Sequence, residues 1–390
     1  MIVSRSRSLC SAASPLVAAL LAVGLSAKAQ DDLVIDSFES SGTITFNEVP
    51  DATEYRVEWA PEPVEPWTNM SAIPAAGSGI VTASVPIVSQ TMVYRVVMTI
   101  PPPVTPVTFE MVTVGNPGNG ADTTTYGAVA ESFKISKFEV TNEQYTQFLN
   151  AVDPTGTNPN GVYNSNMGSY PRGGISFNTG AANGAKYSVK TDMGNKPVNY
   201  VSFFDAMRFV NWLENGQVPG GDTESGVYTI GTGLDETRAV GASFFIPSED
   251  EWYKAAYHDP VNTGADGNGT ADYWLYPTQS DSVPTLATAD ANGNVSNPGA
   301  NVANYNSGAD WNGQNGNVTT VGSATATSFY GAFDMGGNLW EWNEAVIASS
   351  RGFRGGSWNF SVFDLRSSGR LNYNPTFEFD YFGFRVASPQ

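Results

Sequence analysis

Residues 331–342 read Gly331-Ala332-Phe333-Asp334-Met335-Gly336-Gly337-Asn338-Leu339-Trp340-Glu341-Trp342. Adjacent glycines favour a tight turn, and an acidic residue stands on each side of this one. Four oxygen ligands fall within eight residues: the carboxylates of Asp334 and Glu341 and the carbonyls of Gly337 and Leu339. A turn can bend such oxygens around a hard cation, so the segment predicts a structural calcium site. In the alternative interpretation the two acids only cap turns, while the two tryptophans pack in the core.

The composition of the chain excludes several kinds of site. The 390 residues include 38 acidic and 19 basic side chains, and the net charge of −19 disfavours a nucleic-acid partner. One cysteine makes neither an internal disulfide nor a CxxC metal site, and one histidine excludes a metal site built on two imidazoles. The glycine-rich stretch 264–269 does not join a strand to a helix, so it is not a phosphate loop. We expect no haem and no nucleotide.

The first 29 residues have the pattern of a signal peptide. Arg5 and Arg7 precede the apolar stretch 16–25, which is too short to span a bilayer, and Ala27-Lys28-Ala29 fits the small-x-small cleavage pattern. Cleavage after Ala29 would remove Cys10, the one cysteine. We therefore expect a soluble protein, secreted or periplasmic, with no membrane span. The alternative is an unprocessed apolar N-terminus.

Residues 31–100 predict a small all-β module. Alternation of apolar and polar residues indicates strands over 41–49, 54–60, 79–87 and 92–100. About 70 residues of this kind suit a small β-sandwich, loosely like a fibronectin domain. The proline-rich stretch 101–106 predicts a stiff linker.

Residues 107–390 predict a mixed α+β domain with much irregular structure. Three helices are indicated by capping boxes, in which Thr141, Ser202 and Ser248 are each followed three residues later by Gln144, Asp205 and Glu251. Gly216 should end the second helix. The rest is glycine- and asparagine-rich loop and short strand.

Several ordered motifs give this region a family likeness. Beside 331–342 they are Phe138-Glu139-Val140-Thr141-Asn142-Glu143-Gln144-Tyr145, Pro197-Val198-Asn199-Tyr200-Val201-Ser202, Ile246-Pro247-Ser248-Glu249-Asp250-Glu251-Trp252, Arg354-Gly355-Gly356-Ser357-Trp358 and Gly383-Phe384-Arg385-Val386. In this order they resemble the formylglycine-generating enzyme (sulfatase-modifying factor) family, over residues 107–388. The resemblance implies that family's variant of the C-type-lectin-like fold, with structural calcium.

The resemblance also implies specific calcium ligands. At the positions matching Asp334, Gly337, Leu339 and Glu341 the family binds calcium through the first and last side chains and the carbonyls between them. A second family site would fall on Asn304 and the Tyr305 carbonyl, with its other ligands near residues 312–317.

The catalytic residues of the family are not found here. Its prototype enzyme oxidises a sulfatase cysteine with copper held by two of its own cysteines shortly after the Gly-Gly-Ser motif. Residues 358–370 contain no cysteine, so we expect no copper, although Ser357 matches the family's serine. Iron-dependent relatives need several histidines, and His258 stands alone at the end of the third helix, near the favourable C-terminal dipole. We expect a non-catalytic protein; the alternative is a formylglycine-generating oxidase that works without the usual cysteines.

The final segment is the candidate binding surface. In the family fold it would line the pocket where the prototype binds its peptide, and aromatic rings with short polar neighbours can stack on a peptide or glycan. The candidate ligand-binding residues are Ser357, Trp358, Phe360, Phe363, Arg366, Arg370, Tyr373, Phe377, Phe379 and Tyr381. In the alternative, these rings are strand residues of the core, and the chain is a structural surface protein. The oligomeric state has no clear signal in the sequence.

Overall fold

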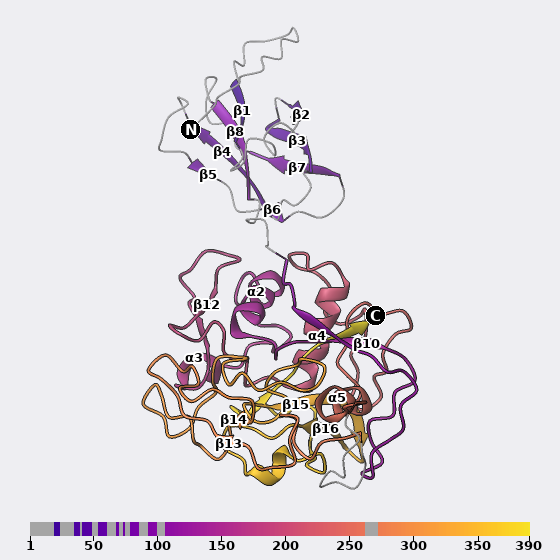
Figure 1. Cartoon of the computed structure of the whole chain (residues 1–390). Coiled ribbons are helices and arrows are strands. Elements are labelled where there is room, and N and C mark those ends of the chain that lie inside the picture. Colours follow the sequence, from indigo (N-terminus) through magenta and orange to yellow (C-terminus); the bar gives the residue numbers. More distant parts are fainter. Residues whose placement is uncertain are drawn as a thin grey trace. The chain divides into compact units, whose positions relative to one another are not determined.

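The computed structural model describes residues 19–23, 35–39, 41–48, 54–60, 68–69, 73–74, 79–85, 93–99, 106–261 and 272–390. The chain divides into two compact units, Met1–Pro103 and Val104–Gln390, which we call the N-terminal and C-terminal units. Figure 1 shows short strands in the first unit and a mixture of helices, small sheets and long connections in the second.

The N-terminal unit is a two-sheet β structure. Its strands are β1 (Ala19–Val23), β2 (Ile35–Phe38), β3 (Thr43–Asn47), β4 (Glu54–Ala60), β5 (Thr68–Asn69), β6 (Ile73–Pro74), β7 (Ile80–Ser84) and β8 (Val93–Thr99). One sheet has the order β1-β8-β4-β5, with β6 also paired to β4, and the other has the order β2-β3-β7. Ile44 and Phe46 of β3 share one buried apolar cluster with Tyr55 and Val57 of β4, so the two sheets face each other across a common core.

The four strands predicted in this unit correspond to β3, β4, β7 and β8. They could be predicted because alternation of apolar and polar residues indicates a strand with one buried face. The short strands β2, β5 and β6 were not predicted. Ala19–Val23, inside the predicted signal peptide, pairs in parallel with β8 as β1. β1 is the edge strand of its sheet. The remaining residues of 1–29 lie outside the described residues, and cleavage after Ala29 stays a prediction.

The C-terminal unit is α+β. Its elements are β9 (Met111–Val114), β10 (Phe133–Ser136), α2 (Asn142–Val152), α3 (Asn166–Ser169), β11 (Ile175–Phe177), β12 (Tyr187–Val189), α4 (Phe203–Glu214), α5 (Glu249–Tyr257), β13 (Thr285–Leu286), β14 (Val302–Ala303), β15 (Trp340–Ile347), β16 (Ser350–Arg354), the 3-10 turn Val362–Leu365, β17 (Leu371–Tyr373), β18 (Phe382–Gly383) and β19 (Ala387–Pro389). The larger sheets have the orders β17-β16-β15-β18 and β19-β10-β9. Pairing of β10 with β19 joins the start of the unit to its end.

The three predicted helices are present, each with its capping box. The hydroxyls of Thr141, Ser202 and Ser248 accept hydrogen bonds from the third residue of α2, α4 and α5. The second helix ends at Glu214, and Gly216 follows it with φ of 84°, the left-handed conformation that glycine adopts easily. The single turns α3 and Val362–Leu365 were not predicted, because one turn is too short to show a periodic pattern.

The core of this unit packs around β15. Trp342 is fully buried. Its ring centroid lies 3.7 Å from the ring centroid of Phe353 on β16 and 5.8 Å from that of Phe203 on α4. Segment 331–342 therefore leads from an irregular turn directly into the central strand. No helix in the described part of the chain is long and apolar enough to cross a bilayer.

Candidate cation-binding turn and aromatic surface

The predicted turn carries the first predicted calcium site and packs against the second. Asp334, Gly337 and Asn338 have φ of 53°, 87° and 58°, and these left-handed residues reverse the chain before β15. Gly337 packs against the backbone of Asn304: a Cβ at position 337 would lie 2.3 Å from the Asn304 carbonyl oxygen. The Asn338 N–H also donates to that carbonyl, at 2.8 Å. The structure thus brings 334–341 and 304–305 together.

Three of the four oxygens of the first predicted site fit a cation. The carbonyls of Gly337 and Leu339 accept no hydrogen bond from the described residues. One carboxylate oxygen of Asp334 accepts from the Gly322 N–H at 2.5 Å. Burial, together with the nearby Glu341 charge, raises the pKa of Asp334 to about 6, so the ionised form lacks compensation. A bound cation would supply it.

Glu341 fits a cation least, because its carboxylate is already largely occupied. Arg385 donates to both of its oxygens, at 2.6 and 2.7 Å, and the Trp252 indole N–H donates at 2.7 Å. Glu341 and Arg385 are completely buried. This bidentate pair locks β15 to the C-terminal segment, and it leaves one lone pair, on Oε1 of Glu341, for a further ligand.

The second predicted site contains a buried acceptor without a partner. Asn304 is 3% exposed, its side-chain amide donates to the Asn317 carbonyl at 2.8 Å, and its Oδ1 has no hydrogen-bond partner. The Tyr305 carbonyl accepts from the Gly308 N–H at 3.0 Å and keeps a second lone pair. Of stretch 312–317, Asn317 is the buried member next to Asn304. Amide and carbonyl oxygens of this kind suit calcium.

Nowhere in the described residues do three His, Cys, Asp or Glu side chains converge on one metal position. A cation in this region would therefore depend on backbone and amide oxygens as well as carboxylates. Glu139 was not among the predicted site residues. It lies in one of the family motifs, is 1% exposed, and accepts from the Asn338 side chain at 3.1 Å. The sequence holds no local signal for this contact, because 199 residues separate the two positions.

The residues that could suggest catalysis are buried. The Ser357 hydroxyl is fully buried and donates to the Asn359 side chain at 2.8 Å. His258 caps α5 as predicted, but its ring is buried, with Nδ1 2.6 Å from the Tyr330 hydroxyl. Desolvation lowers the pKa of His258 to about 4, so loss of solvent outweighs the favourable helix dipole and the ring is neutral at pH 7.

Four rings of the final segment form a connected group, which we call the aromatic surface: Tyr373, Phe377, Phe379 and Tyr381. Their centroids are 5.7 Å apart for Tyr373 and Phe377, 5.8 Å for Phe377 and Phe379, and 5.2 Å for the stacked pair Phe379 and Tyr381. Phe377 is 42% exposed and Phe379 37%. The backbone beneath is fixed, since the Phe379 carbonyl accepts from the Tyr200 N–H.

Burial separates some predicted binding residues from the aromatic surface. Ser357 is fully buried, and Trp358 is 4% exposed beneath the Arg172 guanidinium, so neither lies on the aromatic surface; their contact with a ligand stays a prediction. Both belong to the continuously buried stretch 351–358. Phe360 is half-buried and packs edge-on against both Trp340 and Tyr381, so it adjoins the aromatic surface.

The remaining predicted residues lie apart from the aromatic surface or have their own partners. Phe363 is 63% exposed on the 3-10 turn, with the Arg366 guanidinium 4.5 Å from its ring centroid. Arg370 forms an ion pair with Glu249 at 2.6 Å. These residues can reach solvent, but a ligand of Arg370 would compete with a buried carboxylate.

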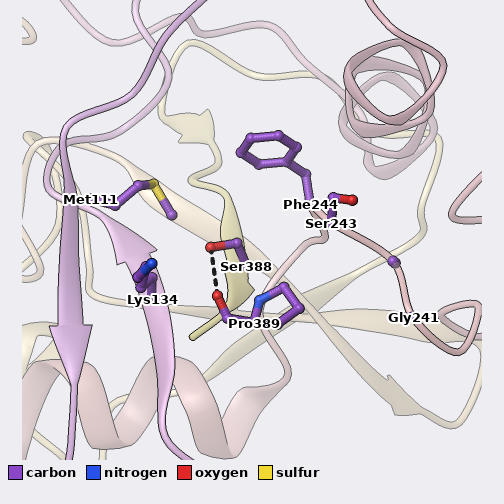
Figure 2. A pocket seen from close by; sticks show the side chains of 8 residues that line it. Met111, Lys134, Gly241, Ser243, Phe244, Ser388 and Pro389 are labelled. Atoms are coloured by element: carbon purple, nitrogen blue, oxygen red, sulfur yellow. Dashed lines mark hydrogen bonds between the residues drawn. The ribbon is translucent and has the colours of Figure 1, made fainter.

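An open groove of about 550 Å³ lies elsewhere, between the β9-β10-β19 sheet and loop 241–244. Figure 2 shows its lining, with Met111, Lys134, Ser388 and Pro389 on the sheet side and Ser243 and Phe244 opposite them. None of the predicted site residues lines it. Its lining includes no carboxylate, histidine or thiol; the polar side chains that it offers are those of Lys134, Ser243 and Ser388.

Comparison with solved structures gives matches of low identity. Treponema denticola variable protein 1 is 18% identical, with 74% of this chain and 97% of that chain covered and a TM-score of 0.43. CarF is 22% identical, with 73% and 99% covered and a TM-score of 0.45. PvdO from Pseudomonas aeruginosa is 19% identical, with 73% and 93% covered and a TM-score of 0.36. No curated protein matches.

The family assignment comes from the domain match. The model of the sulfatase-modifying factor enzyme 1-like domain matches residues 106–389, which is most of the chain and nearly all of the C-terminal unit. These boundaries agree with the likeness that the motifs gave over 107–388. The chain belongs to the sulfatase-modifying factor enzyme 1-like family.

Proposed function

We propose that this protein is an exported, calcium-stabilised binding module that uses the family fold without oxidase chemistry. The observation that carries the proposal is the aromatic surface: two exposed phenylalanines held in contact with Tyr373 and Tyr381 over an ordered backbone. Ordered rings lose little conformational freedom on binding, so they suit recognition of a peptide or glycan. Export remains an expectation from residues 1–29.

The absence of thiols supports a non-catalytic role. Cys10 is the only cysteine of the sequence and lies within the predicted signal peptide. Cu(I) requires soft ligands, and the segment after the Gly-Gly-Ser motif offers Phe360, Phe363 and the buried Leu365 in their place. Copper binding together with conversion of a cysteine-containing sulfatase peptide would instead support the oxidase alternative.

Binding should depend on the aromatic surface. We expect the double variant Phe377→Ala/Phe379→Ala to lose affinity about tenfold or more for ligands found on a glycan or peptide array, since central aromatic contacts dominate such interfaces. Phe329→Ala is the matched control, because Phe329 is also 36% exposed but lies outside the surface. Array binding that persists unchanged in the double variant, or no binding to either array, would favour a structural role.

Removal of calcium should lower the melting temperature. A ligand that binds only the native state stabilises it by about 2.7 kcal/mol at one hundred times its Kd, roughly 5–10 °C for a domain of this size. We expect EGTA to lower the melting temperature by this amount relative to 1 mM calcium (roughly one hundred times a Kd of ~10 μM). Asp334→Ala should remove most of the difference. Asp222→Asn, at a carboxylate that bonds only to its neighbours, should preserve it. Identical melting in EGTA and calcium would rule the metal out.

A further inference from the structure

A buried group of charges in the C-terminal unit is not balanced by its own residues. Glu139 and Glu341 are buried, Asp334 is partly buried, and both Asp334 and Glu341 act electrostatically on Glu139. The nearby cation is Arg385, which donates to Glu341 and to the carbonyls of Ser136 and Phe333 but to neither other acid. The carboxylates of Asp334 and Glu139 thus lack a hydrogen-bonded cation. Two ionised carboxylates in a desolvated site raise the free energy of the folded state.

Glu139 also has an oxygen that nothing satisfies. Its Oε2 accepts from the Asn338 side-chain amide at 3.1 Å, while its Oε1 is buried and has no hydrogen-bond partner among the described residues. The Asn304 amide lies 3.3 Å from the Asn338 Oδ1, and the Oδ1 of Asn304 is another buried acceptor without a partner among the described residues. The Glu139–Asn338–Asn304 chain therefore ends in an unsatisfied oxygen on both sides.

We propose that Glu139 is a charged member of a site for a hard divalent cation, together with the unsatisfied Asn304 oxygen. This inference rests on the calcium binding proposed above and extends it to a residue outside both predicted ligand sets. A cation satisfies unpartnered acceptors and excess negative charge at once, whereas a water molecule would satisfy only the acceptors. In such a site, the side chains of Glu139, Asn338 and Asn304 would connect the two proposed calcium positions.

The test is Glu139→Gln, which keeps the shape of the side chain and removes its charge. We expect calcium affinity, measured by titration calorimetry with calcium chloride, to fall at least tenfold. The melting temperature in EGTA should stay equal to that of the wild-type protein or rise, because an uncompensated charge has gone. Glu139→Asp, which retains the charge, should keep more calcium affinity than Glu139→Gln.

Glu236→Gln is the matched control. Glu236 is also buried, but Arg351 donates to it at 3.2 Å and the N–H groups of Gly231 and Gly233 donate to its other oxygen. This variant should melt lower in both EGTA and calcium, with an unchanged calcium shift. The inference is overturned if Glu139→Gln behaves in the same way. If the wild-type protein itself takes up no calcium, the inference fails together with the calcium part of the proposed function; unchanged affinity in Glu139→Gln overturns this inference alone.

Discussion

Arg385→Met is expected to lower the free energy of unfolding by about 3–5 kcal/mol, the cost of leaving a buried charge without its partner. In the native protein Arg385 donates to both oxygens of Glu341, and both side chains are completely buried. The variant leaves the Glu341 carboxylate with the Trp252 indole as its one remaining donor among the described contacts. Urea unfolding followed by tryptophan fluorescence measures the loss.

A double variant separates the unpaired charge from lost packing. Glu341→Gln/Arg385→Met removes both charges, and the glutamine oxygen can still accept from Trp252, so the double variant should recover much of the stability lost in Arg385→Met. Arg385→Lys keeps the charge but loses the bidentate geometry, and it should fall between the wild-type protein and Arg385→Met. A loss below about 1 kcal/mol in Arg385→Met would mean that Glu341 has another buried cation.

The helices and the turn could be predicted because their determinants are local. A capping box places two interacting side chains three residues apart, and the structure contains all three boxes. The alternating strands of the N-terminal unit are visible for the same reason. The pair of Glu341 with Arg385 spans 44 residues and that of Glu139 with Asn338 spans 199, so no local pattern indicates them.

Exposure of the aromatic residues could not be predicted either. Trp358 and Phe379 both belong to polar-aromatic sequence that looks alike, yet Trp358 is 4% exposed and Phe379 is 37% exposed. The difference arises from distant partners: Arg172 covers Trp358, while Tyr200 holds only the backbone of Phe379. The sequence therefore indicates a candidate binding segment but does not show which of its rings face solvent.

Gly337→Ala should be strongly destabilising, and Gly331→Ala much less so. Both glycines have φ of 87°, so each alanine carries the same left-handed strain of about 1–2 kcal/mol. They differ in their surroundings. A Cβ at position 331 would be 3.7 Å from Val112, an ordinary contact, whereas at 337 it would be 2.3 Å from the Asn304 carbonyl oxygen, which cannot rotate away.

The difference between these two alanine variants therefore measures how tightly 334–341 is packed against Asn304. We expect Gly337→Ala to lose about 2 kcal/mol or more beyond Gly331→Ala in urea unfolding, since the backbone itself must shift. That shift also moves the carbonyl at 337, so the calcium-dependent rise in melting temperature should shrink in Gly337→Ala and stay intact in Gly331→Ala. Equal losses in both variants would show that the turn does not rest on Asn304, and the two proposed cation positions would then be independent.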